Sequence, residues 1–183
     1  EVANLCEKVG ANVQDVARAM GRDGRIGGKF LHPGPGYGGS CFPKDTVALI
    51  RMAQEHGVSS RIVESVVEVN ASQKARMVSK IREALGGSVA DKTIAVLGLT
   101  FKPETDDMRD APSLVILPRL VAAGVAVQAY DPQPGHARQA LPAAVGFAET
   151  ALAAAEGADA VVLLTEWNEF RALSPDRLKA AMT

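Results

Sequence analysis

The second half of the chain alternates short apolar runs with helical patterns, and this alternation restricts the fold more than any other feature of the sequence. From Asp91 onward, apolar runs at residues 93–97, 125–130 and 159–165 alternate with helical patterns near 112–123, 150–156 and 174–181, and a weak strand pattern lies at 145–147. Short apolar strands joined by helices predict a parallel sheet that is covered on both faces. We therefore predict a Rossmann-like α/β domain over residues 88–183, with ligands beyond the carboxyl ends of its strands.

Residues 1–87 predict a different, helical region. An opening helix should end near Gly10, a second should run from an Asn12 cap to Gly21, and a third should run from Pro43 until Gly57 stops it. A long helix is predicted over residues 60–85, where Ile62, Val66, Val69, Met77, Ile81 and Leu85 recur at helical spacing. Such a helix would span about 39 Å. Because this exceeds a half-domain of this size, the helix should connect two domains or pack against a second copy of the chain.

Composition excludes several classes of protein. The 20 basic and 21 acidic residues give a net charge of -1, which offers no basis for binding nucleic acid or an anionic membrane. The chain holds two cysteines and three scattered histidines, too few for a disulfide framework or a metal site, so we expect a cytoplasmic protein without a metal. It starts inside a helical pattern without Met, signal segment or apolar span, which predicts a portion of a longer protein.

A candidate nucleophile lies in the glycine-rich run Gly34-Pro-Gly-Tyr-Gly-Gly-Ser-Cys-Phe-Pro-Lys-Asp45. Its glycines allow a ligand to approach the backbone closely, and Pro43 presets the first turn of a helix. The thiol of Cys41 would then face unpaired amides with Lys44 nearby, which favours the reactive thiolate. Asp45 would lie one turn along and could orient the thiol or a water molecule. The alternative is a buried, inert cysteine, as we expect for Cys6 on the apolar face of the first helix.

Three stretches, residues 30–45, 98–113 and 165–170, resemble the nucleotide-sugar dehydrogenases in content and order. The resemblance implies a helical central dimerisation region over residues 1–87, a UDP-binding domain over 88–183, and an NAD-binding domain that this chain lacks. It also implies an oxidation of UDP-glucose to UDP-glucuronate with NAD. In that reaction Cys41 holds the sugar as a thiohemiacetal and then as a thioester, and Asp45 helps to position or activate the hydrolytic water.

The same resemblance assigns binding roles residue by residue. Lys102 matches a substrate-binding lysine, Arg25 matches an arginine that reaches the substrate of the neighbouring subunit, and Lys44 and Arg109 match cofactor contacts. The loop around the UDP-sugar is implied at Phe30, Leu31, His32, Pro33, Gly34 and Gly38. The expected partners are thus UDP-glucose, NAD and a second copy in a homodimer.

Other interpretations remain open from the sequence. The pattern Gly34-x-Gly36-x-x-Gly39 matches a dinucleotide fingerprint, but no strand precedes it, so it is weak. Without a hydride-acceptor site the chain alone should be inactive, and it could instead serve as a dimerisation and nucleotide-binding module. Dehydrogenases of UDP-N-acetylmannosamine and GDP-mannose share the same chemical logic. A cysteine hydrolase would need a histidine such as His32, whose position in a loop gives it little weight.

Overall fold

The computed structural model describes residues 1–183, which separate by their contacts into two units, residues 1–34 and 35–183. The first unit contains helices α1 (Val2–Val9) and α2 (Val13–Gly21). The predicted cap is confirmed, because the Asn12 side chain accepts a hydrogen bond from the Gln14 amide at 2.9 Å. Cys6 is buried, as expected from its place on the apolar face of α1.

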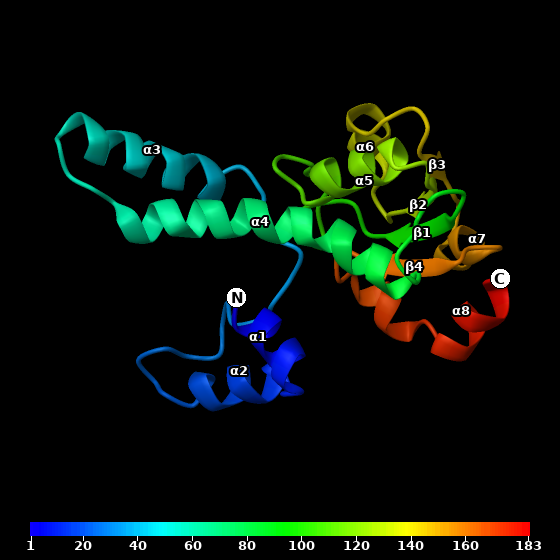
Figure 1. The fold of residues 1–183 in the computed structure, drawn as a ribbon, viewed down its shortest axis with the longest axis horizontal. Coiled ribbons are helices and arrows are strands. Elements are labelled where there is room, and N and C mark those ends of the chain that lie inside the picture. Colours follow the sequence, from blue (N-terminus) through cyan, green and yellow to red (C-terminus); the bar gives the residue numbers. More distant parts are fainter. The chain divides into compact units, whose positions relative to one another are not determined.

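The second unit begins with an antiparallel helix pair, α3 (Phe42–Glu55) and α4 (Arg61–Ala84), drawn in cyan to green in Figure 1. α4 has 24 residues and ends before the glycine pair Gly86 and Gly87, close to its predicted bounds. Its C-terminal half carries Ile81 into the core of the sheet domain, with Met77, Val78 and Leu85 packed beside it. The separation of the chain therefore falls at Gly34, and α4 belongs to the same unit as the sheet.

The sheet has four parallel strands in the order β3-β2-β1-β4. The strands are β1 (Thr93–Leu97), β2 (Ala126–Tyr130), β3 (Gly146–Phe147) and β4 (Ala160–Leu163). The connecting helices are α5 (Ser113–Ala122), α6 (Gly135–Ala140) and α7 (Ala151–Ala155), and a 3-10 turn at Asn168–Ala172 precedes α8 (Pro175–Ala181). This confirms the predicted Rossmann-like α/β arrangement.

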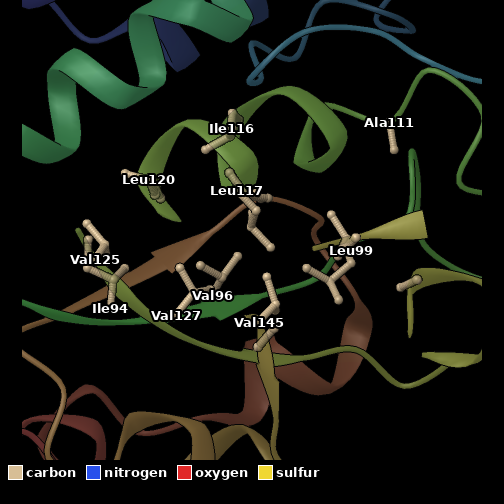
Figure 2. Close-up of a cluster of buried hydrophobic side chains, with 14 of the residues drawn as sticks. Ile94, Val96, Leu99, Ala111, Ile116, Leu117, Leu120, Val125, Val127 and Val145 are labelled. Atoms are coloured by element: carbon tan, nitrogen blue, oxygen red, sulfur yellow. The ribbon is translucent and has the colours of Figure 1, made fainter. Parts of the chain in front are cut away.

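Two apolar clusters cover the two faces of the sheet. Ile94 and Val96 of β1 pack under α5, whose Ile116, Leu117 and Leu120 are fully buried (Figure 2). The alternate residues of β1, Ala95 and Leu97, face α7, Trp167 and Phe170 on the other side. Because successive strand side chains point to opposite faces, a strand buried on both faces reads as an uninterrupted apolar run.

Two expectations for this domain need correction. The run at 159–165 was expected to be a buried strand, but β4 lies at the edge of the sheet and the side chain of Leu163 is 52% exposed. An edge strand has a neighbour on one side only, so apolar content alone overestimates its burial. Helix α6 was not predicted, because six residues that begin with Gly135 carry too little periodicity to detect.

Candidate functional site

Cys41 is exposed and forms the N-cap of α3, as predicted from the glycine-rich run. The Asp45 amide donates to the Cys41 carbonyl at 2.9 Å, which closes the first turn of the helix. The thiol sulfur lies 3.6 Å from the Ser40 hydroxyl oxygen. The alternative of a buried cysteine is therefore wrong for Cys41, and its reactivity stays a prediction.

The glycines before Cys41 make room for other parts of the protein. An added Cβ at Gly36 would lie 2.9 Å from atoms of both Asn70 and Lys74 on α4, and one at Gly39 would lie 2.7 Å from the Phe101 ring. An added Cβ at Gly38 would overlap the carbonyl of Asp110. Helix α4 and the loop after β1 therefore both pack closely against the backbone of residues 35–41, which we call the cysteine loop. This packing explains the glycine spacing without a bound dinucleotide, and no strand precedes it.

Asn70 and Lys74 connect α4 to these loops, and the sequence analysis missed both. The Asn70 amide group accepts from the Tyr37 N–H at 2.7 Å and donates to the Tyr37 carbonyl at 3.1 Å. The buried Lys74 ammonium donates to the Asp110 carbonyl at 2.8 Å, and burial lowers the pKa of Lys74. A signal was present, because both residues interrupt the apolar face of a long amphipathic helix with polar groups.

The loop after β1 is fastened by a buried polar network. The Asp131 carboxylate accepts from the amides of Leu99 at 2.6 Å and Thr100 at 3.3 Å. The Thr165 hydroxyl donates to the Thr100 carbonyl at 2.5 Å, and the Ser113 hydroxyl donates to the Leu99 carbonyl. Because these buried groups satisfy one another, the network fixes the backbone from which Lys102 projects.

Lys102 is exposed at the carboxyl end of β1, where ligands of parallel sheets bind. Its ammonium lies 5.3 Å from the centre of the Phe101 ring, in a cation–π arrangement. Since the same ring lies against Gly39, Lys102 is carried by the loop that packs on the cysteine loop. The cysteine loop and the residue expected to bind substrate thus share one packed assembly in the second unit.

Lys44 and Arg109, the two expected cofactor contacts, each hold a carboxylate. Lys44 pairs with Asp45 at 2.9 Å, and this hydrogen bond raises the pKa of Lys44. Arg109 forms a forked pair with Asp107, with contacts of 2.7 Å to 3.1 Å, which raises the pKa of Arg109 and lowers the pKa of Asp107. A Coulombic interaction with Cys41 makes the smallest contribution to the raised pKa of Lys44 and of Arg109, so both cations lie within electrostatic range of the cysteine.

Arg109 also anchors the cysteine loop and lines a cavity. The Gly39 amide donates to the Arg109 carbonyl at 2.7 Å. A cavity of about 490 Å³ opens beside the Arg109 side chain, lined by Asp106, Asp107, Met108, Arg109, His136, Gln139 and Ala140. It lies between the loop after β1 and the helix after β2, which agrees with the expected ligand edge of the sheet.

The remaining predicted site residues belong to the first unit. Arg25 pairs with Asp23 at 2.6 Å, and Phe30 is 98% exposed with a positive φ of 62°. Leu31, His32, Pro33 and Gly34 complete this loop, in which His32 and Pro33 are exposed. The structure brings together Cys41, Asp45, Lys44, Gly38, Lys102 and Arg109 in the second unit; the roles of all these residues stay predictions.

The parts of the chain that contain these features match known proteins. Residues 1–72 match the central domain and residues 95–183 match the UDP-binding domain of the UDP-glucose/GDP-mannose dehydrogenase family. The chain belongs to this family, which the resemblance had indicated.

Individual relatives agree with the family. A UDP-glucose 6-dehydrogenase of Rhizobium meliloti (strain 1021) is 56% identical over 182 residues, which are 100% of this chain and 42% of the relative. A UDP-glucose 6-dehydrogenase of Bacillus subtilis (strain 168) is 51% identical over 93% of this chain and 39% of the relative. Among solved structures, a UDP-glucose dehydrogenase from Pyrobaculum islandicum is 34% identical with a TM-score of 0.87, over 91% of this chain and 39% of its own. The chain therefore spans about two fifths of the length of these proteins.

No helix of the structure combines the length and the apolar character needed to cross a membrane. No group of three or more His, Cys, Asp or Glu side chains is arranged to hold a metal ion.

Proposed function

We propose that this chain is the thiol-bearing and UDP-binding part of an NAD-dependent UDP-glucose 6-dehydrogenase. The observation that carries the proposal is the packing of the Cys41 loop against the Phe101 and Lys102 loop at the ligand edge of the sheet. A lysine at that edge can pair with the pyrophosphate of UDP-glucose, and an exposed thiol is accessible to the sugar. The names of the relatives at 56% and 51% identity support the same substrate.

The proposed reaction removes two hydrides from C6 of the sugar, which NAD would accept when it is bound, and each hydride leaves together with a proton from the C6 oxygen. After the first removal the Cys41 thiolate adds to the C6 aldehyde and forms a carbon–sulfur bond, and the C6 oxygen takes up a proton from water to give a thiohemiacetal. Removal of the second hydride converts this adduct to a thioester. Water then attacks the thioester carbon, the carbon–sulfur bond breaks, and the thiol leaves with UDP-glucuronate as the product.

Several residues of this chain have auxiliary roles in the proposal. Asp45 positions or activates the hydrolytic water, which requires it to exchange its ion pair with Lys44 for the water. Such an exposed pair contributes little to stability, so the exchange costs little. Lys44 and Arg109 contact the phosphates of NAD, and the exposed edge of the 490 Å³ cavity gives Arg109 access to them.

The substrate-binding roles of residues in the first unit are also part of the proposal. The UDP-sugar is proposed to be contacted by Phe30, Leu31, His32, Pro33, Gly34 and Gly38, and backbone amides of a glycine-containing loop can approach its pyrophosphate. Arg25 reaches the substrate of the second subunit. Its exposed guanidinium, paired with Asp23 two positions earlier, is available for such a contact.

We also propose a homodimer and a cytoplasmic location. Met52, Ile62 and Val66 expose apolar surface on the α3 and α4 pair, which a second copy of the chain would cover. Both cysteines are free, which is typical of proteins in the reducing conditions of the cytoplasm.

Calorimetry on the chain tests the substrate assignment. UDP-glucose and UDP should bind alike and GDP more weakly, and Lys102→Ala should weaken UDP binding about tenfold because it removes one charge-assisted contact. Lys179→Ala, which removes another exposed lysine of the same domain, is the matched control and should bind as the wild type does. Indifference of UDP binding to the Lys102 change would refute the assignment. In the longer enzyme two NADH should form per UDP-glucose, and none should form with this chain alone.

A further inference from the structure

Lys74 is a buried charged residue that the proposed reaction does not use. Its side chain belongs to a residue only 8% exposed, and lysine is almost never buried to this extent unless it is paired. The ammonium makes its hydrogen bond to a backbone carbonyl, that of Asp110, 36 positions further along the chain. A buried charge that holds a distant loop by its backbone fixes the position of that loop.

Asn70, one helical turn before Lys74, holds the other loop. It accepts from and donates to the backbone of Tyr37, at 2.7 Å and 3.1 Å, and so mimics a strand partner for the cysteine loop. Two neighbouring side chains of α4 therefore hydrogen-bond to two separate loops: Asn70 to the loop of residues 36–39 and Lys74 to the loop of residues 108–111. Between these loops the Gly39 amide donates to the Arg109 carbonyl at 2.7 Å.

We propose that Lys74 and Asn70 are positioning residues that hold the cysteine loop and the loop of residues 108–111 together, so that the side chain of Arg109 stays near the Cys41 thiol. The proposal adds two residues to the proposed dehydrogenase site. Their role in catalysis rests on the proposed function, whereas their role in holding the two loops does not. The contact between the loops can be tested without any turnover. If the dehydrogenase assignment failed, the test of the loop contact would still be valid. If the loop contact failed its test, the dehydrogenase assignment would still stand.

The geometry is specific to these positions. Gly36 leaves room for both Asn70 and Lys74, because an added Cβ would lie within 2.9 Å of each side chain. Gly38 leaves room for the Asp110 carbonyl, the group that accepts from Lys74. The electrostatic range between Arg109 and Cys41 supports the same arrangement. Loss of either grip should let the loops separate and move the guanidinium away from the sulfur.

The test compares two alkylating agents of similar size on the 183-residue chain, neutral iodoacetamide and anionic iodoacetate. The ratio of their rates at Cys41 reports the local positive charge, whereas a change in exposure alters both rates together. Lys74→Met should lower the iodoacetate-to-iodoacetamide ratio by less than about threefold, because Arg109 is paired with Asp107 and only part of one unit charge would leave Coulomb range in water. Arg82→Met, an exposed charge deletion on the same helix, should leave the ratio unchanged.

A double substitution separates position from direct charge. Arg109→Leu should lower the ratio more strongly, because it also leaves the Asp107 carboxylate unpaired. Lys74→Met combined with Arg109→Leu should lower the ratio no further than Arg109→Leu alone, because Lys74 acts through Arg109. Additive effects, or an unchanged ratio in Lys74→Met, would overturn the proposal. The thermal midpoint of Lys74→Met should stay within about 3 °C of the wild type, because Met fills the same space without the cost of burying a charge.

Asn70→Leu provides an independent variant without a change of charge, with exposed Ser72→Ala as its control. Hydrogen exchange in residues 36–41 should accelerate about tenfold in Asn70→Leu and in Lys74→Met, because the Gly39 amide loses its bond to Arg109. Exchange at the wild-type rate in both variants would show that the two loops hold together without α4, and would also overturn the proposal.

Discussion

The helical segments and the sheet domain bury their apolar residues to very different extents. In the sheet domain Ile94, Val96 and Leu117 are completely buried, whereas the large apolar side chains that are strongly exposed lie almost all in residues 2–66, with Leu163 as the exception. Helix α2 has no buried residue, and the buried residues of α3 and α4 include the polar Thr46 and Lys74. The difference teaches that the sheet domain forms a complete core together with the C-terminal half of α4, whereas the other helical segments leave large apolar side chains exposed.

The largest effect should come from a core deletion in the sheet domain. Leu117→Ala should lower the free energy of unfolding by about 2–5 kcal/mol, because it leaves a cavity among packed side chains. Ile62→Ala, at a residue of α4 that is 82% exposed, should change the free energy of unfolding by less than about 0.5 kcal/mol in the monomer. Urea unfolding of both variants measures the contrast. Equal losses would mean that the helices have a complete core as well.

Self-association should depend on the exposed helical face. Ile62→Lys would place a charge in the proposed interface and should weaken the dimer by about 2 kcal/mol, close to thirtyfold in Kd. Sedimentation velocity across micromolar concentrations measures this change. Ala71→Lys, at an exposed position on the opposite side of α4, should leave association intact. A wild-type chain that stays monomeric at these concentrations would contradict the proposed homodimer.

The two thiols should differ in reactivity as their surroundings differ. Exposed Cys41 should react with iodoacetamide at least about tenfold faster than Cys6, which is 6% exposed within the first unit. Peptide mass spectrometry over a time course gives both rates in one sample. In urea the two rates should become equal, which controls for intrinsic reactivity. A faster reaction at Cys6 in the folded chain would contradict the assignment of Cys41 as nucleophile.

The smallest effect concerns the alkaline stability of the sheet domain. Burial, together with a hydrogen bond to Glu169, raises the pKa of Tyr130 to about 12 from its ordinary value of 10.0. A raised pKa means that the folded state favours the protonated phenol, so this contribution is complete below pH 10.0 and is lost as the pH rises through about 12.

Comparison of the wild type with Tyr130→Phe isolates this contribution. The difference in free energy of unfolding between the two proteins should shrink as the pH rises from 10.0 through about 12, because only the wild type loses the protonated phenol. Absorbance titration of the phenol provides a second measurement. A difference that stays constant over this range would contradict the raised pKa.

The fold could be predicted because its signals are local. The bounds of β1 agree with the predicted 93–97, and the long helix agrees within a residue at each end, since apolar periodicity and glycine stops act over a few positions. The burial of β4 was predicted wrongly, because strand order decides burial and strand order depends on the whole sheet.

The candidate site was only partly predictable for the same reason. The position of Cys41 at a helix start follows from Pro43 and the glycines, and the loop after β1 follows from the parallel sheet. The hydrogen bonds of Asn70 and Lys74 to two loops could not be predicted from local sequence, because they join residues 33 and 36 positions apart. Polar interruptions of an apolar helix face indicate that such partners exist, but they do not identify them.

The Asp131 carboxylate has a consequence for how this fold could be altered. In related nucleotide-binding sheets a ligand phosphate uses the free amides that follow the first strand. Here the Leu99 and Thr100 amides already hold an internal anion, and Gly98 has a φ of 81° with no space for a side chain beside Thr165. The Asp131 carboxylate therefore permanently occupies the amides that a ligand phosphate would otherwise bind. Grafting a glycine fingerprint onto this turn would therefore not create a dinucleotide site while Asp131 remains, because an incoming phosphate would meet a buried charge of its own sign.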